Sequence, residues 1–342
     1  MRYKLLGKSG LRVSELCLGT MTFGMEWKWG SSKTESRKVY DTFRTAGGNF
    51  IDTADLYTNG TSERFLGSFV AGHREEVVLA TKYTLGNPGN DPNAAGNHRK
   101  NMMQSVEASL KRLKTDYIDL YWLHIWDFMT PVEEVMRAFD DLVRQGKILY
   151  VGISDTPAWV IARADTMAEL RGWTPFTALQ IEYSLIERTP ERELLPMARA
   201  LDLAVTPWSP LAGGILSGKY LKKGGKRRDA KRGLQPDARK TRISQAVAGV
   251  ANEIGRTPAQ VALAWLRQQP GVVIPIIGTR TPAQLKDNLG SLEFTLEGPH
   301  LKKLDEASHI EMGFPNDFFA SDMVRGYTYG GMYDQIDDHR LR

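Results

Sequence analysis

The chain has 342 residues, of which 42% are hydrophobic and 25% are charged, and it contains one cysteine, Cys17. This composition excludes a disordered chain, a collagen and a disulfide-stapled scaffold. Because a lone cysteine cannot form an intramolecular disulfide, a reducing, cytoplasmic location is expected. The N-terminal residues lack the apolar run and the cleavage site of a signal peptide, and no stretch is long enough for a membrane span.

The net positive charge of the chain comes from one segment. The whole chain carries a formal charge of +5, while residues 219–242 hold 11 Lys+Arg and 2 Asp+Glu and carry +9, so the other residues net −4. A nucleic-acid partner would need a basic face rather than one basic segment, and none is expected. The segment is either a solvated surface insertion or a mobile cover over an anionic ligand.

Short runs rich in Val, Ile, Leu and Tyr alternate along the chain with amphipathic stretches, of which 99–113 and 132–143 have the clearest apolar faces. The runs predict eight parallel strands. In chain order these are Glu15–Leu18, Asn49–Asp52, Val77–Thr81, Tyr117–Leu123, Ile148–Ile153, Ala178–Glu182, Ala204–Pro207 and Val272–Ile277.

Eight strand–helix units favour a closed barrel over a doubly wound sheet. We therefore predict an α/β fold, a single (β/α)8 TIM barrel over residues 1–342, although the length alone would suggest two domains. Residues Tyr3–Val13 are predicted to form a hairpin at the bottom of the barrel. Long loops are expected at 86–97 and 219–242, and the aromatic tail after Glu311 is expected to pack against the rest.

Thr-Pro pairs predict helix starts, with threonine as the N-cap and proline at the first helical position. They begin at Thr130, Thr156, Thr189, Thr257 and Thr281. Glu133 and Gln284 stand three residues after Thr130 and Thr281, a spacing that predicts two capping boxes.

Four polar residues stand at or just beyond three consecutive predicted strand ends: Asp52, Tyr57, Lys82 and His124. In a barrel these ends lie side by side at the rim where active sites form. Taken singly, they could be a buried Asp–Lys ion pair, a loop tyrosine and a core histidine. Taken together, they form a candidate acid–base group.

This group suits proton donation to a carbonyl oxygen. The Lys82 ammonium is expected to lower the pKa of Tyr57, Asp52 keeps Lys82 charged, and His124 can orient the carbonyl. Because the side chains supply no reductant, a cofactor that carries hydride is implied. The chain has no G-x-G sequence, which excludes a Rossmann fingerprint, and its histidines lack metal-ligand spacing, so no metal site is expected.

The stretches around these residues resemble the aldo-keto reductase family in order and spacing over nearly the whole chain. They are GTMTFG (19–24), FIDTADLYTNGTSERFLG (50–67), LATKY (79–83), DLYWLH (119–124), VGISD (151–155), QIEYSLIER (180–188), TPWSPLAGGILSGKY (206–220) and IIGTRTPAQLKDNLGSL (276–292).

The resemblance implies a barrel that binds NADP(H) across its C-terminal rim, with Asp52, Tyr57, Lys82 and His124 as catalytic residues and Tyr57 as the general acid. Ser154, Asp155 and Gln180 match the positions that hold the nicotinamide carboxamide. Asp155 replaces the asparagine that is usual there, and a carboxylate can accept from the amide but cannot donate to it. The aromatic residue stacked under the nicotinamide is Tyr183 or Trp208. Further implied cofactor contacts are Gly19, Thr20, Met21 and Asp52 near the nicotinamide, and Ser209, Leu211 and Lys219 over the pyrophosphate.

Gly278, Thr279, Arg280, Gln284 and Asn288 match the family's site for the adenosine phosphate. Many members have an arginine at the position of Gln284, which here could serve only as a cap. NADPH preference then depends mainly on Arg280, with NADH as the alternative.

The resulting hypothesis is an enzyme, an NAD(P)H-dependent oxidoreductase that reduces aldehydes or ketones, with a small-molecule carbonyl compound as its partner. Met25, Trp27, Trp29, Trp126 and the aromatic tail are candidates for the substrate pocket. The alternative within the same family is a slow, NADPH-binding regulatory subunit of a channel. The sequence indicates no oligomeric state.

Overall fold

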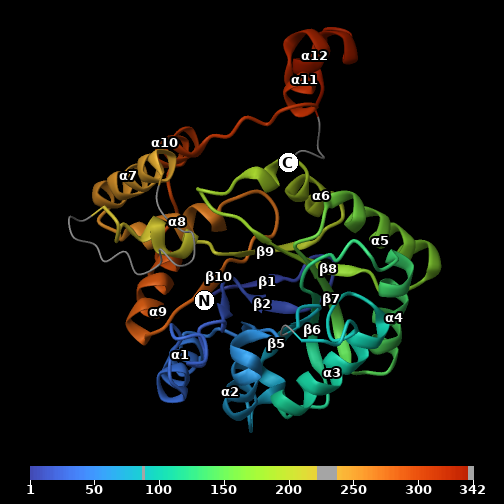
Figure 1. The fold of residues 1–342 in the computed structure, drawn as a ribbon. Coiled ribbons are helices and arrows are strands. Elements are labelled where there is room, and N and C mark those ends of the chain that lie inside the picture. The colour runs from blue at the N-terminus through green and yellow to red at the C-terminus, as the bar shows by residue number, and fades with distance from the viewer. Residues whose placement is uncertain (87–88, 222–236, 338–342) are drawn as a thin grey trace.

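The computed structural model describes residues 1–86, 89–221 and 237–337. Eight parallel strands form one sheet in the order β10-β3-β4-β5-β6-β7-β8-β9, and the bridge between Val205 and Val273 joins its two edges into a barrel (Figure 1). The predicted TIM barrel is confirmed. The strands are β3 (Cys17–Gly19), β4 (Phe50–Asp52), β5 (Val78–Tyr83), β6 (Ile118–Leu123), β7 (Ile148–Ser154), β8 (Phe176–Glu182), β9 (Ala204–Trp208) and β10 (Ile276–Gly278).

Helices surround the barrel, and an antiparallel hairpin of β1 (Tyr3–Leu5) and β2 (Arg12–Ser14) lies at its base, as predicted. The helices are α1 (Lys33–Thr45), α2 (Thr61–Phe69), α3 (Arg99–Leu113), α4 (Val132–Arg144), α5 (Ala158–Arg171), α6 (Leu194–Ala200), α7 (Ala238–Glu253), α8 (Pro258–Arg267), α9 (Pro282–Leu289) and α10 (Gly298–Ser308). No helix in the described ranges combines the length and the apolarity that a bilayer span requires.

All eight predicted strands are present, but the last is shorter than expected. β10 begins at Ile276 rather than Val272, and Val273 forms only the isolated bridge that closes the barrel. Pro275 stands between them, and because proline has no N–H it interrupts the hydrogen-bond ladder.

Two apolar layers fill the fold. One lies between the strands and the helices, and the other fills the barrel interior. Trp122 occupies the interior, and a Cβ on the neighbouring Gly152 would lie 2.3 Å from its ring. Gly152 therefore makes room for the indole. The interior layer also contains Phe50, Val78, Ala80, Ala178, Ala204 and Ile274.

Three of the predicted helix caps were wrong. Thr257 and Thr281 do cap α8 and α9, and each accepts a hydrogen bond from the backbone three residues on. Thr130 and Thr156 do not cap, because their hydroxyls donate to the Asp127 carboxylate and to the Ser154 carbonyl, and α4 and α5 begin two residues later.

Thr189 opens a short 3-10 turn, and its hydroxyl donates to the Glu187 carboxylate. In the described part of the chain one capping box forms, between Thr257 and Gln260, and the box predicted between Thr281 and Gln284 does not. Glu133 has no capping threonine to complete the box predicted at the start of α4. Acceptors two or three residues earlier in the chain, two carboxylates and one backbone carbonyl, took the three hydroxyls instead.

The expected loop at 219–242 ends earlier than predicted, because Asp237 caps α7 and residues 238–242 form its first turns. Most of the predicted basic segment, residues 222–236, lies outside the described residues.

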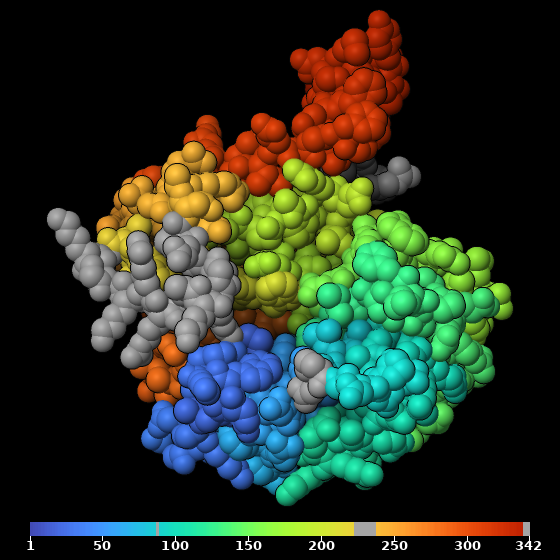
Figure 2. Space-filling view, viewed as in Figure 1, coloured from blue at the N-terminus to red at the C-terminus, as the bar shows by residue number. Residues whose placement is uncertain are grey.

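The aromatic tail does not pack against the barrel as expected. It contains α11 (Asn316–Ala320) and α12 (Asp322–Thr328), which extend away from the body in Figures 1 and 2. Phe314 is 86% exposed, and its ring contacts the ring of Phe318 instead of the barrel. The tail's aromatic composition indicated that burial would be favourable but did not identify a partner surface.

Candidate active site

The carboxyl ends of β4, β5 and β6 bring the four predicted acid–base residues together. Asp52 ends β4, Lys82 lies near the end of β5, and His124 follows β6. Asp52 and Lys82 share the strand parity of Phe50 and Ala80, which line the barrel interior. Alternation along the strands therefore directs both side chains inward at the rim.

Asp52 and Lys82 form a buried ion pair. Lys82 is fully buried and Asp52 is 2% exposed. The Lys82 ammonium donates to Asp52 Oδ2, to the Thr53 carbonyl at 2.8 Å and to the Tyr57 hydroxyl at 3.2 Å. Burial alone would lower the pKa of Lys82, but the charge of Asp52 and the hydrogen bonds from Lys82 to Asp52 and Tyr57 outweigh it and raise that pKa. Lys82 therefore stays an ammonium whose three N–H donors are all engaged.

Gln180 on β8 fixes the other oxygen of Asp52. Its side-chain amide donates to Asp52 Oδ1 at 3.0 Å, and the Thr20 hydroxyl donates to the Asp52 backbone carbonyl at 2.9 Å. Of the predicted cofactor residues, Gln180 thus also holds the buried carboxylate in place, and Thr20 holds the backbone of the same residue.

Tyr57 is positioned by a strained turn. Thr58, Asn59 and Gly60 all have positive φ, and at the β-branched Thr58 φ is 47°. The Thr58 hydroxyl donates to the Phe23 carbonyl at 2.6 Å and accepts from the Ser62 N–H at 3.1 Å. These bonds hold a conformation that L-residues rarely adopt.

The pKa of Tyr57 is raised above its ordinary value, contrary to expectation. Burial raises it, and the nearby Lys82 charge, which lowers it, does not compensate. The phenol therefore keeps its proton near neutrality. Because the Tyr57 oxygen accepts from Lys82, its own O–H is left to donate to another group.

His124 completes the group as a neutral ring. Burial and the Lys82 charge hold the pKa of His124 well below its usual value. The ring packs edge-on against Tyr57 with 5.9 Å between centroids, and its Nδ1 atom is buried without a hydrogen-bond partner among the described residues.

Trp208, not Tyr183, stands at the rim. Tyr183 is fully buried outside the barrel, where it contacts Trp265 and donates to Glu191 at 2.8 Å. Trp208 is half-buried at the end of β9, packs against the interior layer and donates its indole N–H to Asp155 Oδ1 at 3.0 Å.

The residues predicted for the nicotinamide end lie on neighbouring strands. Gly19 is in register with Asp52, and Ser154 is in register with Gln180. Met21 is 38% exposed beyond β3. The Ser154 hydroxyl is buried without a partner among the described residues.

The residues predicted for the adenosine end lie where β10 runs beside β3. Gly278 pairs with Gly19, and the Thr22 hydroxyl donates to the Thr279 carbonyl at 2.7 Å. The Thr279 hydroxyl is buried and unpartnered in the described ranges. Gln284 accepts from the Arg280 backbone N–H at 2.9 Å and not from that of the N-cap Thr281, so its bond is local but does not complete the predicted capping box. Asn288 is buried on α9.

The segment predicted to cover the pyrophosphate follows β9. Ser209 has φ 54°, Leu211 is half-buried, and Lys219 is exposed with its ammonium on the Gly213 carbonyl at 3.0 Å. The structure therefore brings the tetrad of Asp52, Tyr57, Lys82 and His124 close to the residues predicted for the nicotinamide. The residues predicted for the pyrophosphate and for the adenosine phosphate lie along the same rim.

Sequence reasoning missed Asp55, an acid two residues before Tyr57. Its Oδ1 atom is buried without a hydrogen-bond partner among the described residues. Burial and the neighbouring charge of Glu63 raise the pKa of Asp55 to about 8. The signal for it was a second acid, after Asp52, within the DTADLY loop.

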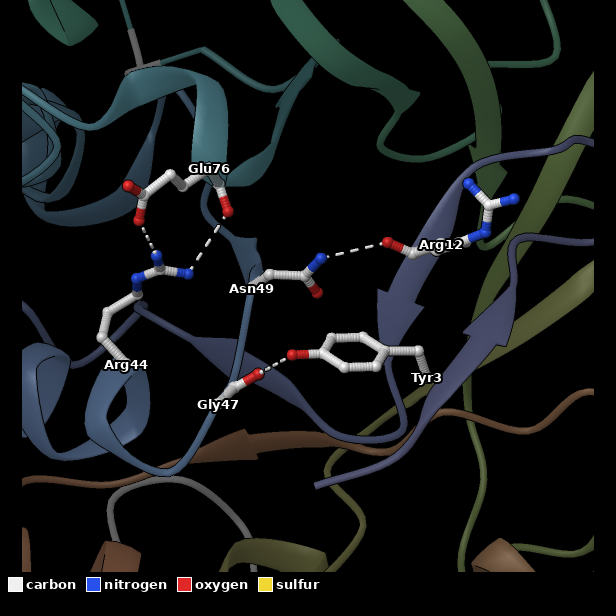
Figure 3. Close-up of a pocket in the computed structure, with 6 residues that line it drawn as sticks. All are labelled: Tyr3, Arg12, Arg44, Gly47, Asn49 and Glu76. Carbon is white, nitrogen blue, oxygen red and sulfur yellow. Dashed lines mark hydrogen bonds and ion pairs between the residues drawn. The ribbon is translucent and has the colours of Figure 1, made fainter.

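A hollow of about 340 Å³ lies at the opposite end of the barrel (Figure 3). Its polar groups largely bond to one another, as in the bond from the Tyr3 hydroxyl to the Gly47 carbonyl at 2.8 Å and the bond from Asn49 to the Arg12 carbonyl at 3.0 Å. The base of such a barrel supports stability, whereas the rim carries the chemistry.

Comparison with known proteins agrees with this geometry. The model of the aldo/keto reductase family matches residues 15–309. The chain is 38% identical to norsolorinic acid reductase from Aspergillus flavus over 334 residues, which cover 94% of this chain and 85% of that one. It is 41% identical to norsolorinic acid reductase stcV from Emericella nidulans over 330 residues (93% and 84%), and 36% identical to aryl-alcohol dehydrogenase [NADP(+)] from Phanerodontia chrysosporium over 350 residues (95% and 91%). The chain belongs to the aldo/keto reductase family.

Proposed function

We propose that this chain reduces aldehyde or ketone carbonyls to alcohols with NADPH as the preferred cofactor, and that Tyr57 donates the proton. The observation that carries the proposal is the contact of Lys82 with both Asp52 and Tyr57 at the barrel rim. It leaves a protonated phenol with its O–H directed away from the ammonium.

Each side chain has a separate role at the substrate carbonyl. Tyr57 holds a proton that it can deliver to the carbonyl oxygen, and Lys82 stabilises the phenolate that this leaves. The neutral His124 ring can donate a hydrogen bond to the same oxygen and orient it. Asp52 and Gln180 keep the ammonium in place.

The buried groups at the rim fit a nicotinamide cofactor, which would supply hydride when bound. The hydroxyls of Ser154 and Thr279 lack partners among the described residues, and burial without a partner disfavours such groups unless a ligand satisfies them. Ser154, Asp155 and Gln180 would hold the carboxamide. Gln180 donates its amide to Asp52, so its carbonyl oxygen is the atom it offers the ligand.

The other end of the cofactor would lie along β10 and α9. Ser209, Leu211 and Lys219 would cover the pyrophosphate. Gly278, Thr279, Arg280 and Asn288 would line the adenosine phosphate, where the exposed Arg280 guanidinium supplies the charge that distinguishes NADPH from NADH. The printed name of the Phanerodontia relative includes NADP(+), which supports this preference.

An apolar, aromatic carbonyl compound is the proposed substrate. Trp27 packs edge-on against Tyr57 with 6.3 Å between centroids, and it contacts Trp29 at 5.7 Å. The printed name of one relative, aryl-alcohol dehydrogenase, agrees with an aryl substrate. We further propose a cytoplasmic location, since Cys17 is a buried free thiol.

The test is a fluorescence titration of the purified protein with NADPH and with NADH, followed by a screen of aryl aldehydes and ketones with the tighter cofactor. We expect NADPH to bind about tenfold more tightly than NADH and Arg280→Ala to abolish that difference. Gln284→Ala serves as the control and should keep it. Binding of neither cofactor would contradict the proposal.

A further inference from the structure

Asp155 is a second carboxylate that the fold fixes beside the tetrad. It follows β7 with φ 39°, a conformation that needs support. Its N–H donates to the Gln180 carbonyl at 3.2 Å, its carbonyl accepts from the Trp126 N–H at 3.4 Å, and its Oδ1 accepts from the Trp208 indole at 3.0 Å. Backbone and side chain are therefore both held in place.

The charge of Asp155 interacts electrostatically with Tyr57 and with Lys82. Burial raises the pKa of Asp155, opposed by the Trp208 hydrogen bond and the Lys82 charge. Asp155 in turn is one of the charges that raise the pKa of Tyr57, after the larger effects of burial and Asp52. Glu182, half-buried at the end of β8, is the other acid coupled to Asp155.

The hydrogen-bond partner of Asp155, the Trp208 indole, does not neutralise the charge of the carboxylate. An indole N–H donates a hydrogen bond but carries no charge, unlike a guanidinium or an ammonium. The nearby Lys82 ammonium directs its three N–H groups to Asp52, Thr53 and Tyr57. The ionised Asp155 thus adds a net negative charge at the rim.

We propose that Asp155 stabilises the oxidised nicotinamide ring over the reduced ring, and so favours hydride donation to the substrate. This inference rests on the proposed function. In that reaction a hydride, one proton with two electrons, leaves C4 of the reduced ring and bonds to the carbonyl carbon. Tyr57 supplies a proton to the carbonyl oxygen, and the ring changes from neutral to a charge of +1. A fixed carboxylate attracts only the oxidised ring.

The experiment measures binding without turnover. Calorimetric titration at about pH 8, well above the ordinary pKa of a carboxyl group, gives the Kd of NADP+ and of NADPH for each variant. Asp155→Asn keeps the shape and removes the charge, so the ratio of the NADP+ Kd to the NADPH Kd should rise by about tenfold. An unchanged ratio would overturn the inference.

Three further variants separate charge from structure. Asp155→Glu retains the charge and should keep the ratio within about twofold of the wild type. Trp208→Phe removes the indole N–H and should shift the ratio less than Asp155→Asn, because the charge remains. Glu182→Gln removes the neighbouring charge, and a shift as large as that of Asp155→Asn would contradict a specific role for Asp155.

The outcomes also distinguish this inference from the function on which it rests. If the wild type bound neither NADP+ nor NADPH, the proposed function would fail, and this inference with it. If the wild type bound both and Asp155→Asn weakened them equally, the proposed function would stand and the charge effect of Asp155 would be refuted.

Discussion

Glu15 at the base of the barrel and Asp55 at its rim have pKa values that the fold shifts in opposite directions. At the base, burial would raise the pKa of Glu15, but bonds from Arg267 and from the Arg2 N–H outweigh it and lower that pKa. At the rim, burial dominates and raises the pKa values of Asp55, Tyr57 and Asp155. The fold therefore stabilises the charged form of Glu15 at the base, whereas burial penalises the charged forms of Asp55, Tyr57 and Asp155 at the rim.

This contrast separates positions that stabilise the native state from positions that suit proton transfer. A charge with good partners strengthens the native state. A buried acid with a raised pKa, such as Asp55 or Tyr57, weakens the native state and suits proton transfer. Substitutions at one end should therefore differ in effect from similar substitutions at the other.

The largest contrast should come from two tyrosines. Tyr57→Phe removes the proposed proton donor, so turnover should fall by about 10²–10⁴-fold while the Kd of NADPH stays within about twofold. Tyr3→Phe at the base removes a bond to the Gly47 carbonyl and should leave turnover unchanged. Steady-state rates and cofactor titration of both variants check this. Normal carbonyl reduction by Tyr57→Phe would refute the assignment of the acid.

Much of the fold could be predicted from the sequence. The runs rich in Val, Ile and Leu identified all eight strands, because strands buried on both faces are rich in apolar residues along their length. Asp52, Lys82 and His124 stood out because each is a polar residue at the end of such a run. The parallel barrel then brings these ends together.

Contacts set by side-chain geometry could not be predicted. The bond from Gln180 to Asp52 joins residues 128 positions apart. The motif suggested a cofactor role for Asp155 but gave no sign of its bond with Trp208. Thr130 had the sequence of a helix cap, but Asp127 took its hydroxyl. A sequence pattern limits the possible hydrogen-bond partners of a side chain, and the folded geometry decides which of them it binds.

The second contrast concerns the Asp52–Lys82 ion pair. Lys82→Met leaves Asp52 buried and without its cation, so the free energy of unfolding should fall by about 3–5 kcal/mol. Turnover should fall as well, because Tyr57 loses the ammonium that stabilises its phenolate. Denaturant unfolding monitored by circular dichroism measures the stability, and Lys82→Met combined with Asp52→Leu is the control. If the double variant were no more stable than the single one, the unpaired carboxylate would not be the cause.

The third contrast is in pH dependence. The pKa of Asp55 is raised to about 8, with Glu63, Arg112, Lys82 and Tyr121 as its charged or titratable neighbours. Between about pH 4 and pH 8 the unfolded chain has released this proton and the native chain retains it, so rising pH lowers stability. Asp55→Asn should therefore gain about 1–3 kcal/mol at pH 8, and the gain should vanish near pH 4.

Glu15 at the base should give the opposite sign. The pKa of Glu15 is lowered on folding, so its contribution to stability is present above its unfolded pKa and is lost as pH falls through the folded value. Glu15→Gln should destabilise the protein at neutral pH, and the loss should shrink in acid. Thermal melts of both variants across pH test the pair. Parallel profiles for the two would contradict the contrast between rim and base.

The smallest effect is expected at the hollow in the base. Glu76 is 66% exposed and pairs with Arg44 at 2.7 Å. Glu76→Gln should cost at most about 1 kcal/mol, because water and salt screen an exposed pair. Arg44 keeps its bond to the Gly48 carbonyl at 2.9 Å, so the local backbone remains anchored. The difference in melting temperature should shrink further in high salt, and turnover should match that of the wild type. A loss of carbonyl reduction in this variant would show that chemistry extends to the base, which the distribution of buried acids argues against.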